Sequence, residues 1–172
     1  MPVVAIAFGS NLGNRVGQIE RAIGLLGEQL AIGGVSPLYE TAPMYVTDQP
    51  PFVNGALLAE TQMGPMALLR LLKECEAMVG RLPRERNGPR EIDLDLVRYG
   101  ELQLTSELGE TSLRLPHPRL HERRFVLQPL YDLDPSMRIP GLGGIESLLA
   151  ATESQAASVR RVNDASVSIP VH

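Results

Sequence analysis

The sequence has one cysteine, no tryptophan and few other aromatic residues, and each scarcity narrows what the protein can be. Because Cys75 is the only cysteine, no internal disulfide can form, and we expect a reducing compartment. Aromatic residues make up 4% of the chain against 44% for all hydrophobic residues, so the core must be mainly aliphatic. The length of 172 residues suits one domain, and we expect residues 1–172 to form a single domain.

Positive charge and long apolar runs are scarce too. The formal net charge is -4, so the bulk charge does not favour a nucleic-acid partner. Lys73 is the only lysine, and every other fixed cation is an arginine, whose planar fork of donors matches pairs of phosphate oxygens. No apolar stretch approaches the ~20 residues that span a bilayer, and the N-terminus lacks a signal-peptide pattern. We therefore expect a cytoplasmic protein without nucleic-acid or membrane partners.

The hydrophobic pattern predicts alternating strands and helices. Six segments have the periodicity of a strand or a helix: strands at 3–8, 35–39, 52–61 and 91–99, and helices at 16–30 and 65–79. The first strand is an unbroken apolar run, which suits burial on both faces, and Gly33 and Gly34 are predicted to end the first helix. The order βαββαβ predicts an α+β fold, a ferredoxin-like sandwich with its helices on one face of an antiparallel sheet.

The remaining segments are predicted to be loops, a hairpin and a C-terminal extension. Residues 41–51 contain three prolines and read as an exposed loop, and the polar residues 81–90 cannot form a regular element. Residues 102–115 are predicted to form a hairpin or a loose extension, followed by a short helix at 123–131. Because the sequence turns small and polar after Leu149, we expect a loosely packed tail from about residue 150.

The clearest chemical signal is the pair of carboxylates at Asp93 and Asp95. Side chains alternate along a strand, so both point to one face, with Cα atoms about 6.5–7 Å apart. Two such anions repel each other unless a cation lies between them. Mg²⁺ is the natural candidate, since it is commonly held by one or two carboxylates together with substrate phosphates. The alternative is a strand with an ordinary solvated acidic face.

Four arginines precede this acidic pair, at positions 81, 84, 86 and 90. Guanidinium groups beside metal-binding carboxylates are what a polyphosphate with its metal requires. The alternative is that these arginines pair with nearby glutamates on the surface. His117 lies between two prolines that restrict its backbone, so it could donate to a phosphate oxygen or transfer a proton. The alternative for His117 is a loop histidine without a role.

Four separated motifs resemble those of one family. They are IAFGSNLG at 6–13, YETAP at 39–43 with DQPPFVN at 48–54, NGPREIDLDL at 87–96, and LPHPRL at 115–120 followed by RRFVLQPL at 123–130. In these motifs the chain is similar to the 6-hydroxymethyl-7,8-dihydropterin pyrophosphokinases of folate biosynthesis. The resemblance implies transfer of pyrophosphate from ATP to the hydroxymethyl group of the dihydropterin, with release of AMP. It also implies a monomer.

The resemblance also implies roles for individual residues. Asp93 and Asp95 match the ligands of two Mg²⁺ ions, and with Arg84 and Arg86 they make up the implied catalytic set. The implied ATP-binding residues are Glu76, Arg81, Arg84, Arg86, Arg90, His117 and Arg123. The implied pterin-binding residues are Thr41, Pro43, Met44, Phe52, Asn54 and Phe125. One departure from the family lies in this region, since Asn87 stands where many members carry tryptophan.

Two other functions remain open from the residues alone. A metal-dependent phosphohydrolase would also use Asp93, Asp95 and His117, but would release phosphate or pyrophosphate without a pterin. A ferredoxin-like RNA-binding module would need exposed aromatic residues on its sheet and a basic face. The low aromatic content and the negative net charge argue against the RNA-binding module.

Overall fold

A six-stranded antiparallel sheet forms the centre of the protein, in a computed structural model that describes residues 1–108 and 111–162. Its strands are β1 (Val3–Ser10), β2 (Ala31–Val35), β3 (Tyr39–Thr41), β4 (Phe52–Glu60), β5 (Asp93–Tyr99) and β10 (Val159–Arg161). The strand order is β10-β3-β4-β1-β5, and β2 also pairs with β4. With its helices, this sheet confirms the predicted mixed fold built on an antiparallel sheet.

The region between the first helix and β4 differs from the prediction. Helix α1 (Arg15–Gly27) ends earlier than expected, and both Gly33 and Gly34 lie inside β2 instead of ending the helix. The predicted single strand at 35–39 is instead two strands, β2 and β3, which pair with successive parts of β4. Pro37 lies between them and cannot donate a hydrogen bond to the ladder. Pairing with the long β4 thus outweighs the helical periodicity that favoured a longer α1.

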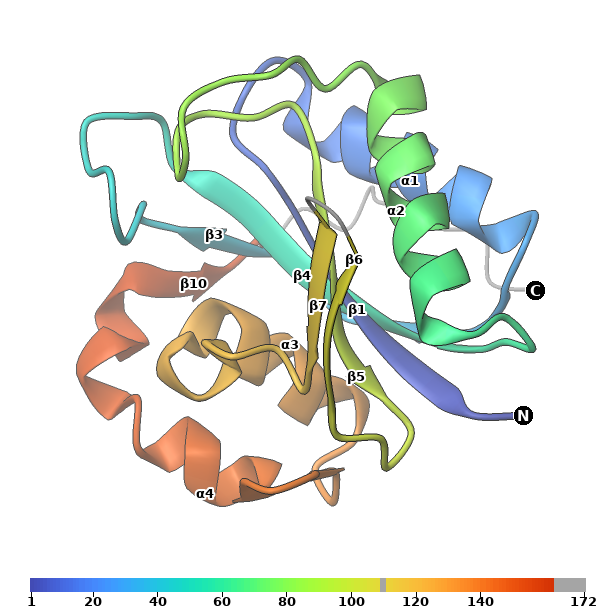
Figure 1. The fold of residues 1–172 in the computed structure, drawn as a ribbon. Helices are drawn as coiled ribbons and strands as arrows, with labels where there is room; N and C mark the ends of the chain where they lie inside the picture. The colour runs from blue at the N-terminus through green and yellow to red at the C-terminus, as the bar shows by residue number, and fades with distance from the viewer. Residues whose placement is uncertain (109–110, 163–172) are drawn as a thin grey trace.

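The helices cover both faces of the sheet, so the prediction of helices on one face was wrong. Helices α1 and α2 (Pro65–Val79) lie on one face, and α3 (Arg124–Leu133) and α4 (Ile145–Ala150) lie on the other (Figure 1). Strand β1 explains this arrangement. Val4, Ile6 and Phe8 join the core under α1 and α2, whereas Ala5 and Ala7 join the core against α3. A strand that is apolar on both faces needs a covering layer on each.

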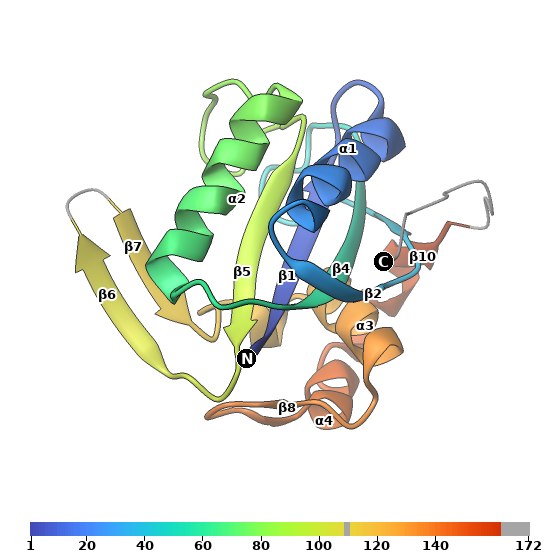
Figure 2. The same ribbon diagram turned by 90° about the vertical axis from the view of Figure 1, so that its right-hand side faces the viewer.

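A two-stranded hairpin and a shorter one complete the described elements. Strands β6 (Leu104–Leu108) and β7 (Thr111–Leu115) pair with each other, which confirms the hairpin alternative for this region. Figure 2 shows this hairpin extending beside α2, away from the main sheet. The 3-10 helix η1 (Leu120–Glu122) connects this hairpin to α3. Strand β8 (Arg138–Ile139) pairs with β9 (Gly143–Gly144). None of the described helices is long and apolar enough to cross a membrane.

The segment predicted as a loosely packed tail contributes to the main sheet in its described part. After the turn η2 (Glu153–Ser158), β10 pairs with β3, and Val162 N–H donates to the Leu38 carbonyl at 2.8 Å. Thr152 is 3% exposed. Without a neighbour, the edge of β3 would leave backbone N–H and C=O groups unpaired. Strand β10 pairs with these groups through its own backbone, so its polar side chains do not prevent the pairing. Residues 163–172 lie outside the described part of the chain.

Candidate active site

The register of the sheet brings the two aspartates and Asn54 to one face. Gly9 of β1 pairs with Asn54 of β4 on one side and with Asp93 of β5 on the other. One pleat further along β1, Ala7 pairs with Asp95. Directly paired residues point to the same face of a sheet, so these side chains share a floor. The small residues Ala7 and Gly9 run between the two outer strands and leave the space above that floor open.

A cavity of about 340 Å³ lies over this floor, which is in the size range of small-molecule pockets. It is bounded by the loop between β3 and β4 and the loop between α2 and β5, which lie at the same end of the sheet (Figure 1). Every predicted site residue except Glu76 lines it: Thr41, Pro43, Met44, Phe52, Asn54, Arg81, Arg84, Arg86, Arg90, Asp93, Asp95, His117, Arg123 and Phe125. Residues from distant parts of the sequence thus meet in one place.

The two aspartates have different surroundings. Asp93 Oδ1 lies 3.0 Å from Arg81 Nη1 and 3.3 Å from Arg90 Nη1, so its charge is compensated. Asp95 forms no ion pair within the described residues. Burial, and then the neighbouring charge of Asp93, raise the pKa of Asp95 above its ordinary value. Within the protein alone, the ionised form of Asp95 is therefore unfavourable.

This donor set fits Mg²⁺. The described residues contain no cluster of three or more histidine, cysteine, aspartate or glutamate side chains that could enclose an ion. Mg²⁺ does not need one, because it is usually held by one or two carboxylates, with phosphate oxygens and water completing its coordination. A divalent cation near Asp95 would also offset the repulsion that disfavours its charge. The carboxylates that would hold it are Asp93 and Asp95.

Glu76 lies behind the cavity and contacts Arg81. Its Oε2 accepts a hydrogen bond from Arg81 Nη1 at 2.5 Å and another from the backbone N–H of Leu94 at 2.9 Å. Arg81 Nη1 also donates to Asp93 Oδ1, so one guanidinium nitrogen bridges two carboxylates. Burial raises the pKa of Glu76, whereas the hydrogen bond from the Leu94 N–H and the charge of Arg81 act in the opposite direction. The structure therefore places Glu76 where it orients Arg81, and Glu76 lines an adjoining pocket together with Arg81, Arg84 and Arg90. Its predicted role in ATP binding stays a prediction.

The arginines of the loop at 81–90 differ in how they are held. Arg84 forms a hydrogen-bonded ion pair with Glu91, and this bond lowers the pKa of Glu91 although burial works against it. Arg86 is exposed and forms no ion pair within the described residues. Of the predicted surface pairings with glutamate, those of Arg81 and Arg84 are present. Both arginines still line the cavity, so pairing and cavity lining coexist.

His117 is buried as a neutral imidazole that accepts a backbone hydrogen bond. Burial, and then the nearby charge of Arg123, lower its pKa to about 4. Its Nδ1 accepts a hydrogen bond from the backbone N–H of Arg119 at 3.1 Å. The single proton of the neutral ring must then lie on Nε2. Of the two roles predicted for His117, donation to an anionic ligand suits this tautomer.

The other half of the cavity presents an oriented amide between aromatic side chains. The Thr41 hydroxyl donates to Asn54 Oδ1, which fixes which end of the amide is the acceptor. A Cβ atom at Gly9 would lie 2.5 Å from Asn54 Nδ2, so only glycine leaves room for this amide. Phe52 and Phe125 also line the cavity. Aromatic faces and an amide with both donor and acceptor suit a flat ring with polar edges.

Sequence reasoning missed the residues that hold the loops together. Asn11 is 2% exposed, and its amide donates to Gln49 Oε1 at 2.9 Å and accepts from Arg90 N–H at 2.8 Å. Gln49 Nε2 in turn donates to the Asn87 carbonyl at 2.9 Å. The only signal for them in the sequence was their presence inside the family-like motifs.

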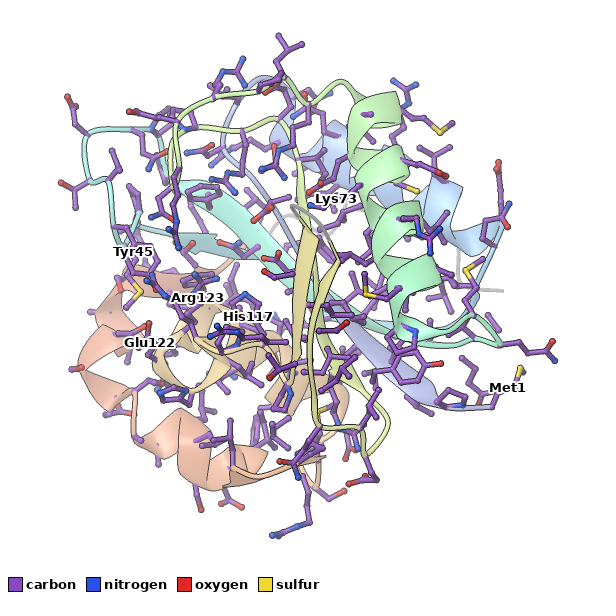
Figure 3. All side chains as sticks on the ribbon, in the orientation of Figure 1. Met1, Tyr45, Lys73, His117, Glu122 and Arg123 are labelled. Atoms are coloured by element: carbon purple, nitrogen blue, oxygen red, sulfur yellow. The ribbon has the colours of Figure 1, made fainter. Side chains whose placement is uncertain are left out.

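Tyr45 was also missed, and it projects from the loop at 42–51 toward α3. Its ring lies 4.9 Å from the guanidinium carbon of Arg119 and 5.4 Å from that of Arg123. Figure 3 shows Tyr45, Arg123 and Glu122 close together on the left of the molecule, with His117 nearer its centre. Nothing in the sequence pattern singles out this tyrosine, because the contact joins residues more than seventy positions apart.

Comparison with known proteins identifies one family throughout. The family model described as 7,8-dihydro-6-hydroxymethylpterin-pyrophosphokinase matches residues 5–135. The chain is 40% identical over 150 residues to the 2-amino-4-hydroxy-6-hydroxymethyldihydropteridine pyrophosphokinase of Pseudomonas aeruginosa, covering 86% of this chain and 90% of that protein. It is 46% identical over 131 residues to the mitochondrial folate synthesis bifunctional protein of Pisum sativum. That match covers 76% of this chain and 25% of the pea protein, so this chain spans only about a quarter of that relative's length.

A solved structure shares the fold. A crystal structure of Plasmodium falciparum HPPK-DHPS with pterin and p-hydroxybenzoate superimposes with a TM-score of 0.77. The match covers 93% of this chain and 47% of the Plasmodium chain, at 15% sequence identity. At that identity the likeness establishes the fold alone.

Proposed function

Because this chain belongs to the 7,8-dihydro-6-hydroxymethylpterin-pyrophosphokinase family, we propose that it transfers the terminal pyrophosphate of ATP to the hydroxymethyl group of 6-hydroxymethyl-7,8-dihydropterin. The products are AMP and the pterin diphosphate, in folate biosynthesis. The observation that carries this proposal is one cavity with two different halves. One half has arginines beside paired carboxylates, and the other has an oriented amide beside aromatic rings.

The nucleotide occupies the charged half of the cavity. Arg81, Arg84, Arg86, Arg90 and Arg123 line it and hold the phosphate oxygens through charge-assisted hydrogen bonds. His117 donates its Nε2 proton to a phosphate oxygen. Glu76 keeps Arg81 in place, which frees the rest of that guanidinium for the ligand. Negative charge that develops on the phosphoryl groups is thereby stabilised by groups that are already oriented.

The pterin occupies the half that contains Asn54. Phe52 and Phe125 contact the faces of the ring, and the Asn54 amide contacts its polar edge. Thr41 fixes the orientation of the amide, and Pro43 and Met44 close this side. The hydroxymethyl oxygen then faces the β-phosphorus of ATP and attacks it in line. Closure of the two loops excludes water, which protects ATP from hydrolysis.

Asp93 and Asp95 are the residues that would hold Mg²⁺. Bound there, Mg²⁺ would neutralise negative charge on the phosphates. Two ions, as the family resemblance implies, are part of this proposal. The role of the protein in this arrangement is to keep both carboxylates on one face of β5, with Arg81 and Arg90 limiting the repulsion around Asp93.

We also infer that the sheet follows the ferredoxin-like plan. If β2 and β3 are counted as one interrupted strand, the chain runs strand, helix, two strands, helix, strand, and the strand order fits that plan. Strand β10 and the second helical layer are then additions to it. The monomeric state, the cytoplasmic location and the single domain remain predictions from the sequence.

The direct test is to incubate the protein with ATP, Mg²⁺ and the hydroxymethyl-dihydropterin and to follow AMP. We expect AMP and pterin diphosphate in equal amounts, and no AMP when the pterin is omitted. Release of phosphate or pyrophosphate without pterin would indicate the metal-dependent phosphohydrolase instead. If none of these products forms but single-stranded RNA binds, the RNA-binding alternative would hold. The comparisons support neither alternative.

A further inference from the structure

We propose that Tyr45 is a positioning residue for Arg123, and that through this contact it links the nucleotide and pterin halves of the cavity. The inference rests on the proposed function and adds a residue to it. Tyr45 lies in the loop that also carries Pro43 and Met44, on the pterin side. Arg123 precedes α3 and lies among the arginines assigned to the nucleotide.

Tyr45 contacts Arg123 in two ways. The guanidinium carbon of Arg123 lies 5.4 Å from the centre of the Tyr45 ring, within the ~6 Å at which a cation is attracted to an aromatic face. Arg123 Nε also donates a hydrogen bond to the Tyr45 hydroxyl at 3.2 Å. The hydroxyl in turn donates to Glu122 Oε1 at 3.3 Å. A ring contact and a hydrogen bond together define both the position and the rotation of the guanidinium.

This arrangement uses Nε of Arg123 and leaves its two Nη groups available. Neither Nη group forms a hydrogen bond or an ion pair within residues 1–108 and 111–162. Arg123 lines the cavity together with Asp93, Asp95 and His117, which places its charge at the end assigned to the phosphates. Two parallel N–H groups are the part of arginine that best matches a pair of phosphate oxygens.

The same guanidinium connects Tyr45 to Phe125. Arg123 lies 5.8 Å from the centre of the Phe125 ring as well, so two aromatic side chains flank it. Phe125 is one of the rings assigned to the pterin. A shift of Arg123 on nucleotide binding would therefore change its contact with Phe125. Through Tyr45 it would also displace the loop beside the pterin. Tyr45 also contacts Arg119, and its negative ring face lowers the repulsion between the two guanidinium groups.

The test measures binding of α,β-methylene-ATP with Mg²⁺ by calorimetry, because this analogue cannot transfer its pyrophosphate. We expect Tyr45→Leu, which removes both contacts, to raise Kd about tenfold. Tyr45→Phe keeps the ring and loses the hydrogen bonds, so we expect a rise of about threefold. Tyr131→Phe is the matched control, because Tyr131 lies in α3, packs against the core and does not line the cavity. The Kd of this variant should equal that of the wild type.

A double-mutant cycle separates positioning of Arg123 from a general effect on the loop. In an Arg123→Gln background, Tyr45→Leu should change Kd less than about twofold, because its partner is already absent. An equal loss in both backgrounds would show that Tyr45 acts without Arg123, and an unchanged Kd for Tyr45→Leu in the wild-type background would also overturn the inference. Failure of the wild-type protein to form AMP would count against the proposed function instead, because analogue binding is measured independently of turnover.

Discussion

At the scale of single residues, two side chains in this cavity are kept away from their ordinary charge states by burial. Asp95 lies beside Asp93 without an ion pair among the described residues, and its pKa is raised. His117 is buried beside Arg123, and its pKa is lowered. Groups with displaced pKa values that share a cavity are typical of functional sites. The shifted pKa values of Asp95 and His117 therefore lead to one prediction for each residue.

Replacing Asp95 by asparagine should remove activity while preserving the fold. We expect kcat for AMP release to fall on the order of 1,000-fold, because a charged group at the phosphate end is lost. Burial raises the pKa of the Asp95 carboxyl in the folded protein. Without Mg²⁺, this carboxyl therefore lowers the free energy of unfolding as the pH rises above about 3.9, the ordinary pKa of an aspartate. The Asp95→Asn variant should therefore unfold at the same or a higher temperature at pH 7. Near-normal AMP release by Asp95→Asn would rule out the metal role of Asp95. Asp134→Asn, at the end of α3, is the control and should keep the wild-type activity.

His117 should stay neutral in the folded protein down to about pH 4. The imidazole of the unfolded chain takes up a proton below about pH 6.5, so protonation favours unfolding between those values. The stability that His117 contributes should therefore decrease as the pH falls from 6.5 to 4, relative to His117→Gln. Nitrogen chemical shifts of the imidazole should give the low pKa and the Nε2–H tautomer. An ordinary pKa near 6.5 would contradict the desolvation of the imidazole by burial.

At the scale of elements, the two loops over the cavity form one hydrogen-bonded unit. Gln49 joins the loop at 42–51 to the Asn87 carbonyl, and Asn11 joins both loops to the turn after β1. Asn87 has a φ of 59°, the one non-glycine residue with positive φ among the described residues. Asparagine tolerates this left-handed conformation better than most residues. A tryptophan, which the family resemblance led us to expect at this position, would be more strained in this conformation.

Replacing Gln49 by leucine should loosen both loops at once. The variant loses its hydrogen bonds to Asn11, Val46 and Asn87, each worth about 0.5–1.5 kcal/mol. Hydrogen exchange of backbone amides should therefore increase in residues 81–90 as well as in 42–51, and kcat/KM should fall about tenfold. Gln62→Leu, at an exposed position between β4 and α2, is the matched control. Faster exchange in residues 42–51 alone would mean that the loops move independently.

At the scale of the whole molecule, the C-terminal part of the chain supports the site from a distance. Strand β10 closes the sheet beside β3, and the Ser158 carbonyl accepts a hydrogen bond from Ala42 N–H at 3.2 Å. Ala42 directly follows Thr41, whose hydroxyl orients Asn54. On the same face, the Tyr39 hydroxyl donates to Asp132 and ties β3 to α3. Segments outside the cavity thus determine where the part that contains Thr41 and Asn54 lies.

Shortening the chain at residue 158 should weaken both the fold and pterin binding. The matched control is a chain that ends at residue 162, so that the two differ only in β10 and Val162. We expect the shorter chain to have a free energy of unfolding lower by about 1–3 kcal/mol, because the ladder with β3 is lost. The KM for the pterin should rise several-fold, with less effect on the KM for ATP. Equal values for the two chains would show that β10 does not support the site.

Short-range information predicted many of these features. The buried strand β1, helix α2 between Pro65 and Gly80, and the shared face of Asp93 and Asp95 all follow from the spacing of side chains within a few residues. The arginine loop beside the aspartates could be recognised for the same reason. By contrast, most of β2 was missed, because Gly33 and Gly34 were interpreted as a helix stop and its weak pattern does not reveal the partner strand β4.

The sequence by itself predicted most of the residues that line the cavity, because strand alternation and motif spacing are local properties of the chain. Only the tertiary structure decided how those residues are held. The second helical layer, the pairing of β10 with β3, the place of Glu76 behind Arg81 and the contact of Tyr45 with Arg123 all join residues that are far apart in sequence or lie on different elements. Such contacts form when the burial of apolar surface brings the elements together, and no local pattern encodes which distant partner each side chain will meet.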